Sequence, residues 1–144
     1  FDRLFCAENP FDEYVCYYEI IRLLSFVASE KEQRLPPYIA QALHYIKDNY
    51  SEKISVEDIA AQVQLSSSHL FAVFKKQMGV SPISFLNSYR MSIAAELLQG
   101  TTKSISQIAS EVGIDDSIYF NKMFKKHYQM SPTEYRNCYI TKAE

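Results

Sequence analysis

The sequence has few of the features that mark an enzyme. It contains three glycines and no tryptophan among 144 residues. So few glycines leave no glycine-rich loop that could hold a phosphate. No nucleophile is placed beside a base in a catalytic motif. We therefore expect a protein without catalytic residues.

Metal and disulfide chemistry also have little support. The three cysteines, Cys6, Cys16 and Cys138, are an odd number without CxxC spacing, which favours reduced thiols in a cytoplasmic protein. The three histidines lie far apart and lack HExxH spacing. We expect no metal ion and no other cofactor.

Long apolar runs are absent as well. No segment reaches the roughly 20 apolar residues of a membrane span, so we expect no membrane partner. The first residue is Phe, and no basic segment follows it. This beginning favours a fragment of a longer protein over a signal peptide.

An excess of positive charge is missing too, because the formal net charge is −2. This value argues against a generally basic nucleic-acid binder. Residues 1–36 hold seven acids and four bases, which leaves ten acids and eleven bases in the rest of the chain. Residues 37–144 are therefore close to neutral, and the positions of their lysines matter more for a partner than the net charge does.

What the sequence does contain is one segment written twice, at residues 55–82 and 104–132. The offset between the copies is 49 before a turn and 50 after it. Two copies are too few for a solenoid, so they indicate a duplicated structural unit. The matched pairs include Ile59 with Ile108, Ala60 with Ala109, Val63 with Val112, Leu70 with Phe120, Phe74 with Phe124, Lys75 with Lys125, Lys76 with Lys126 and Pro82 with Pro132.

Each copy is typical of a helix, a tight turn and a second helix. Ser55 with Asp58, and Ser104 with Gln107, have the spacing of a capping box at the start of the first helix. Apolar residues then recur at three- and four-residue steps.

The turns and the second helices follow the same plan. Gly113 suits a turn with positive φ, and Gln64 holds the equivalent place. Ser66 and Asp116 are good N-caps for the second helices. The outward faces of those helices then carry Ser67, Ser68, Phe71, Ala72 and Lys75 in the first copy, and Ser117, Ile118, Asn121, Lys122 and Lys125 in the second. Such a unit is a helix-turn-helix, whose second helix can enter the major groove of DNA.

A long helix is expected between the copies. Ser81 and Pro82 form an N-cap with proline at the first helical position, and Gly100 is a natural C′ residue. A helix over 82–99 would be roughly 25 Å long. This scale suits two helices held about one DNA turn, roughly 34 Å, apart.

These motifs together resemble the DNA-binding domain of the AraC/XylS family, over about residues 38–137. The resemblance implies a bacterial transcription regulator that binds promoter DNA and most often activates. Its residues are Ile59-Ala60, Phe74-Lys75-Lys76, Gly79, Ser81-Pro82, Arg90, Ala94, Leu97-Leu98, Ile108-Ala109, Val112-Gly113, Asp116, Tyr119-Phe120, Phe124-Lys125-Lys126, Ser131-Pro132 and Tyr135-Arg136.

The chain departs from the family pattern at a few positions. Gln129 stands where the second copy usually has glycine, which predicts a left-handed glutamine at that helix end. Ile118 replaces a usual small polar residue, so a hydroxyl contact to DNA is not expected there.

The resemblance places base contacts at Ser67, Ser68, Phe71 and Ala72 in the first copy and at Ser117, Asn121 and Lys122 in the second. Asn121 can bind the N6 and N7 edge of adenine, and Lys122 a guanine or a phosphate. Phe71 and Ala72 can contact only apolar groups such as a thymine methyl; the alternative for Phe71 is partial burial beneath a neighbouring helix.

Phosphate contacts are expected from cations. Lysine pairs recur at the same place in both copies, which favours a positive face over two solvated helix ends. The predicted set is Lys75, Lys76, Lys122, Lys125, Lys126 and Arg90.

Residues 1–36 differ from the rest. They contain one expected amphipathic helix, with Cys16, Ile20, Leu23, Leu24 and Val27 on one face, and a charged linker. This helix either packs on the rest of the chain, or ends a sensing domain, or forms a homodimer. A small-molecule effector would bind only through a preceding domain.

The predicted fold is all-α. Two helix-turn-helix subdomains, at about 55–78 and 104–128 within a domain over 37–144, are joined by a long central helix and preceded by an extra N-terminal helix. The predicted function is a sequence-specific regulator that binds double-stranded promoter DNA, with RNA polymerase as a further partner. The alternative is a protein-interaction module that uses the same fold without reading sequence.

Overall fold

A computed structural model describes residues 35–140 of the chain, and within that range every regular element is an α-helix. The predicted all-α class is therefore confirmed. The extra helix expected within residues 1–34 lies outside the described residues. The helices are α2 (Pro37–Asp48), α3 (Val56–Gln62), α4 (Ser67–Met78), α5 (Pro82–Gly100), α6 (Ile105–Glu111), α7 (Ser117–Tyr128) and α8 (Pro132–Ile140). None of these helices is both long and apolar enough to cross a bilayer.

The helices begin where the capping residues predict. Both predicted capping boxes are present, at Ser55 with Asp58 and at Ser104 with Gln107. The hydroxyl of Ser55 and its backbone N–H both donate to the Asp58 carboxylate, and these bonds lower the pKa of Asp58. Each box satisfies backbone donors that helices only seven residues long would leave open.

The two helix-turn-helix units repeat one backbone path. The turn residues Gln64 and Gly113 both have positive φ, at 56° and 78°. The residues that follow the second helices also have positive φ, 74° at Gly79 and 59° at Gln129. The left-handed glutamine predicted at position 129 is confirmed.

The central helix ends differently from the prediction. Gly100 was expected as a C′ residue after the last helical turn, yet it is the last residue of α5. Thr101 follows in an extended conformation, and its hydroxyl donates to the Leu97 carbonyl oxygen at 2.6 Å. The prediction for Gly100 was wrong because the threonine side chain satisfies an open carbonyl and no left-handed residue is needed.

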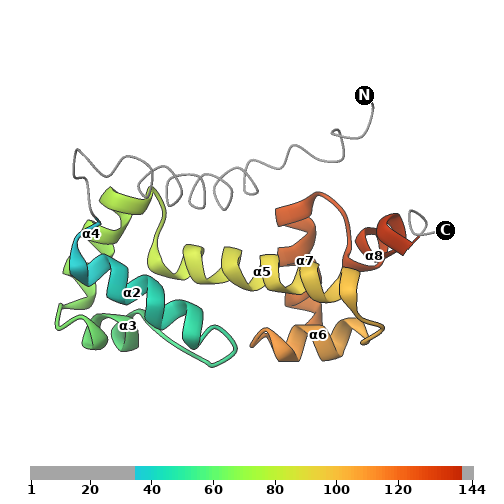
Figure 1. Ribbon diagram of the computed structural model, residues 1–144, viewed down its shortest axis with the longest axis horizontal. Helices are drawn as coiled ribbons and strands as arrows, with labels where there is room; N and C mark the ends of the chain where they lie inside the picture. Colours follow the sequence, from blue (N-terminus) through green and yellow to red (C-terminus); the bar gives the residue numbers. More distant parts are fainter. Residues whose placement is uncertain (1–34, 141–144) are drawn as a thin grey trace.

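Helix α5 belongs to both halves of the molecule (Figure 1). Its first half contributes Leu86 to a core built with α2, α3 and α4. Its second half contributes Met91, Ala94 and Leu98 to a core built with α6, α7 and α8. With 19 residues, α5 is about 28 Å long. We call α2, α3 and α4 with the first half of α5 the first unit, and the second half of α5 with α6, α7 and α8 the second unit.

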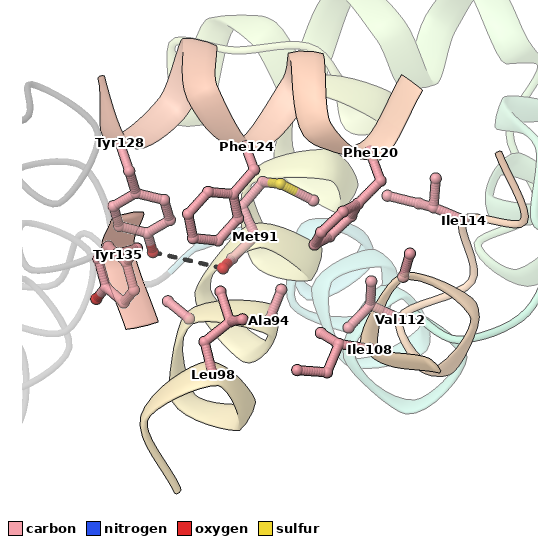
Figure 2. Packing of buried hydrophobic residues seen from close by; sticks show 12 residues of the cluster. Met91, Ala94, Leu98, Ile108, Val112, Ile114, Phe120, Phe124, Tyr128 and Tyr135 are labelled. Atoms are coloured by element: carbon pink, nitrogen blue, oxygen red, sulfur yellow. Dashed lines mark hydrogen bonds between the residues drawn. The ribbon is translucent and has the colours of Figure 1, made fainter. Parts of the chain in front are cut away.

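Aromatic rings fill much of the second core (Figure 2). Phe124 is fully buried; its ring lies 4.7 Å from that of Tyr128 and 5.4 Å from that of Tyr135, centroid to centroid. The hydroxyl of Tyr128 reaches the Met91 carbonyl oxygen at 3.5 Å. Helix α8 therefore closes this core, because Tyr135 packs on both other rings.

Candidate nucleic-acid interface

Helices α4 and α7 each bury one stripe and expose the other. Leu70 and Phe74 of α4, and Phe120 and Phe124 of α7, are fully buried. Of the twelve residues predicted to contact DNA, ten are exposed, Ser67 is half-buried and Arg90 is buried. The ten exposed residues are Ser68, Phe71, Ala72, Lys75, Lys76, Ser117, Asn121, Lys122, Lys125 and Lys126.

The exposed face of α7 begins at a capped N-terminus. The carboxylate of Asp116 accepts hydrogen bonds from the backbone N–H groups of Ile118 and Tyr119, at 2.8 and 3.0 Å. One turn later, the Asn121 amide donates to the Ser117 carbonyl oxygen at 2.7 Å. Asn121 is exposed, and its amide carries a second donor hydrogen and an acceptor oxygen beyond this bond.

Phe71 lies on the exposed face of α4. Its side chain is 44% exposed, and the Lys75 ammonium lies 6.0 Å above the centre of its ring. A cation at this distance is attracted by the face of the ring. Phe71 therefore belongs to the same surface as the lysine that follows it by one turn.

Large exposed apolar side chains gather on these two helices. Among the described residues they are Phe71, Ile118 and Tyr119, with Ile118 70% and Tyr119 52% exposed. Tyr119 follows Asp116 by three residues and was not among the predicted contacts.

The lysines of α4 and α7 are not used in salt bridges within the described part of the chain. The ion pairs found there join His44 with Asp48, and Lys103 with Glu111. Lys75 and Lys76 lie in the last turn of α4, and Lys125 and Lys126 in the last turn of α7. Both helices therefore present exposed cations at their C-terminal ends.

Arg90 was predicted to contact DNA, but the structure gives it another place. The side chain is 8% exposed and lies in the middle of α5. Its Nε and Nη2 atoms donate to the backbone carbonyl oxygens of Tyr50 and Glu52, each at 2.7 Å. The helical spacing could have predicted this burial. Four residues at four-residue steps share one face of α5, and all are buried: Leu86, Arg90, Ala94 and Leu98.

Gly113 lies against the same loop. A Cβ atom at this position would be 2.5 Å from the Ser51 carbonyl oxygen and 3.0 Å from Nη2 of Arg90. Only glycine fits there without movement of the backbone. We call Tyr50, Ser51, Glu52, Arg90 and Gly113 the junction, because they join the α2–α3 loop, α5 and the turn of the second unit.

Within residues 35–140, no group of three or more histidine, cysteine, aspartate and glutamate side chains could hold a metal ion.

Comparison with known proteins agrees with this architecture. Residues 59–137 match a family model described as a helix-turn-helix domain. The chain is 42% identical over 99 residues to a lactose operon transcription activator of Staphylococcus xylosus, covering 69% of this chain and 36% of that protein. It is 34% identical over 118 residues to the arabinose operon regulatory protein of Escherichia coli, covering 79% and 40%. The match thus covers less than half the length of either regulator.

Solved structures match the same region. The C-terminal domain of AraT, a response regulator from Geobacillus stearothermophilus, is 36% identical, with a TM-score of 0.71 and coverage of 74% of this chain and 88% of that chain. An AraC-type DNA-binding domain from Chromobacterium violaceum is 32% identical, with a TM-score of 0.67 and coverage of 70% and 90%. The chain belongs to the AraC/XylS family of DNA-binding transcriptional regulators, a family of regulators and not of enzymes.

Proposed function

We propose that the chain reads a specific sequence of double-stranded promoter DNA by inserting α4 and α7 into successive segments of the major groove. The observation that carries this proposal is the repetition of one exposed face on two helices. The lysines at 75 and 76 recur at 125 and 126, and positions 68, 71 and 72 correspond to positions 118, 121 and 122, which are also exposed but hold different residues. Repetition of these cations at matched places on both helices supports a negatively charged partner that contacts both.

The residues of this face suit different parts of DNA. The exposed lysines bind phosphates, which fixes the protein on the duplex without reading sequence. Asn121 reads adenine, and Lys122 a guanine or a phosphate. Phe71 and Ala72 contact apolar groups, so α7 carries more hydrogen-bonded readout than α4.

The finer role is that of an activator acting in the cytoplasm of a bacterium. A relative named as a transcription activator, that of Staphylococcus xylosus, supports the activating role. We further propose that RNA polymerase is a partner at the promoter. A small-molecule effector would act through a domain outside this chain, and residues 1–36 would contribute a homodimer contact.

Selection of binding sites from random duplexes tests the proposal. Sites enriched by the chain are then titrated at two salt concentrations against random competitor DNA. We expect a preference for the selected site of about 10³-fold or more, and affinity that falls with salt with a slope of about 0.9 per phosphate contact. An equal affinity for random DNA at both salt concentrations would favour the protein-interaction alternative.

Single substitutions assign the roles within the face. Asn121→Ala and Lys122→Ala should each weaken specific binding by about 1–3 kcal/mol, while Lys125→Ala should lower the salt slope by about 1 and weaken binding to all sequences equally. Lys103→Ala is a matched control, because Lys103 lies outside α4 and α7 and is paired with Glu111. If Phe71→Ala were the only harmful change, the assignment of α7 as the main reader would be wrong.

A further inference from the structure

The junction brings the α2–α3 loop of the first unit against the middle of α5 and against the turn of the second unit. Three consecutive residues of the α2–α3 loop take part in it. Tyr50 and Glu52 accept hydrogen bonds from Arg90, and the Ser51 carbonyl lies against Gly113 in the turn between α6 and α7. The loop of the first unit therefore touches both the central helix and the turn that precedes α7.

Side-chain packing strengthens this contact. Tyr50 packs against the buried cluster of the first unit and also against that of the second. Its ring meets that of Tyr89, the neighbour of Arg90, edge to face at 5.4 Å between centroids. The same loop residue is thus held by both halves of the molecule.

The chemistry of Arg90 makes the contact specific. Hydrogen bonds donated by a charged guanidinium to carbonyl oxygens are stronger than those between neutral groups, and the planar guanidinium fixes their direction. Burial lowers the pKa of Arg90 from its ordinary value, although a guanidinium stays charged in proteins. A substitution leaves two carbonyl oxygens of the loop without this donor.

We propose that the junction fixes the distance and angle between α4 and α7. The two half-sites, which are the DNA segments contacted by α4 and by α7, are then recognised only at a single spacing. Arg90 is then a positioning residue for DNA recognition and contacts no DNA itself. This proposal rests on the proposed function, because spacing has meaning only for a chain that reads DNA with both helices. The central helix joins the units, and the junction adds a contact between the α2–α3 loop and the second turn.

Pulsed electron resonance tests the geometry without DNA. Spin labels at Gln62 and Glu111, which are exposed at the ends of α3 and α6, are introduced as cysteines after Cys6, Cys16 and Cys138 are replaced by serine. We expect one narrow distance distribution for the otherwise unchanged chain and a broad one for Arg90→Met. Equally narrow distributions would overturn the proposal, whether or not the chain binds DNA.

A spacing series tests the consequence for recognition. One or two base pairs are inserted between the half-sites of a selected duplex, and each pair moves the second half-site by about 3.4 Å and rotates it by about 35°. We expect the unchanged chain to lose about tenfold or more in affinity for one inserted pair, the size of a single mismatch. Arg90→Met should bind the original and lengthened duplexes within about threefold of each other.

Two further variants keep the outcome clear. Arg136→Met is the matched control, because Arg136 also donates to a backbone carbonyl, that of Lys103, but lies outside the junction; its spacing preference should not change. If circular dichroism shows that Arg90→Met does not fold, Arg90→Lys replaces it, because lysine keeps the positive charge but lacks the planar pair of donors. An unchanged spacing preference in a folded Arg90 variant would overturn the proposal, while a failure to select any site contradicts the proposed function instead.

A second inference comes from the faces of α4 and α7. The aligned pairs are Ser68 with Ile118, Phe71 with Asn121, and Ala72 with Lys122. A polar residue precedes an apolar one on α4, and an apolar residue precedes a polar one on α7. The two helices therefore present their polar and apolar groups in opposite order.

Ile118 is the most exposed of the large apolar residues on this surface, at 70%. It lies three and four residues before Asn121 and Lys122, so all three share one face of α7. The lysines of that face match phosphates, and in the duplex DNA of the proposed function the phosphates lie beside the base edges of the groove. In the major groove, the apolar group that a base edge offers is the thymine methyl.

We infer that Ile118 contacts a thymine methyl group in the second half-site. This inference also rests on the proposed function. The test replaces each thymine of a selected duplex by deoxyuridine, which removes only the methyl group. For the unchanged chain, one replacement in the half-site read by α7 should weaken binding about 3- to 10-fold, and Ile118→Ser, which copies Ser68, should abolish that difference.

The position of the effect decides the outcome. If the Ile118→Ser variant and the unchanged chain lose affinity equally at every replaced thymine, Ile118 does not contact a thymine methyl group, although the chain still reads DNA. Phe71→Ser is the matched control, because it should change the response only at thymines of the first half-site.

Discussion

The two helix-turn-helix units differ at the two places where their shared backbone takes positive φ. The first unit has glutamine in its turn, at Gln64, and glycine after its second helix, at Gly79. The second unit reverses this order, with Gly113 in the turn and Gln129 after the helix. The two units share the backbone conformation, but glycine and glutamine occupy opposite positions in it.

The atoms around Gly113 explain why the second unit has glycine in its turn. A Cβ atom added to Gly79 would meet no heavy atom within 4 Å, whereas one added to Gly113 would meet the Ser51 carbonyl oxygen at 2.5 Å. A left-handed backbone is strained for a residue with a side chain but tolerates one, as at Gln64. Glycine is therefore preferred at position 79 and required at position 113.

The largest expected effect comes from the two glycines. Gly79→Ala should lower the free energy of unfolding by about 1 kcal/mol, the cost of a left-handed alanine. Gly113→Ala should lower it by about 3 kcal/mol or more, because the new Cβ also displaces backbone atoms. Denaturation in urea measures both values. Equal losses would mean that the α2–α3 loop moves away from Gly113 without cost.

A smaller effect distinguishes the units by pH. His127 is 6% exposed, and burial lowers its pKa to about 4. Its counterpart in the first unit, Gln77, is exposed. The unfolded chain binds a proton at this histidine near pH 6.5, so stability is complete above that pH and decreases as the pH falls from 6.5 to 4.

We expect His127 to account for about 2 kcal/mol of the loss of stability between pH 6.5 and pH 4. The measurement is a series of urea denaturation curves over this range for the unchanged chain and for His127→Gln, which copies the first unit. The carboxylates titrate alike in both proteins, so the difference between the two curves isolates the histidine. Parallel curves would contradict its burial in the neutral form.

The smallest expected effect is a gain in stability. Gln129→Gly removes the strain of a left-handed glutamine but loses the hydrogen bond from its side chain to the Lys126 carbonyl oxygen at 3.0 Å. The net result should be an increase of about 0.5–1 kcal/mol in the free energy of unfolding. The reciprocal change, Gly79→Gln, should cost about as much. A loss from both changes would show that the side-chain bond outweighs backbone strain.

Local rules made much of this fold predictable. Capping boxes, N-caps and the alternation of buried and exposed positions act over three or four residues, so Ser55, Ser66, Ser104 and Asp116 could be assigned from the chain alone. The burial of Arg90 was not predicted, because its partners are carbonyl oxygens 38 and 40 residues away. No local pattern states which loop will come to lie against a helix.

The candidate site shows the same division. The outward residues of α4 and α7 followed from helical periodicity and from the family resemblance, and ten of the twelve predicted contacts are exposed. The close approach that makes Gly113 necessary was not predictable, because the need for positive φ gives the same signal at Gly113 and at Gly79.

The shared use of α5 has a consequence for folding. A typical pair of domains is joined by a linker, so one can melt while the other stays intact. Here the helix that completes the first core also begins the second, with Leu86 on one side of Arg90 and Met91 on the other. Unwinding of α5 at either end exposes one core and removes the support of its neighbour. Residues 35–140 should therefore unfold in one cooperative transition.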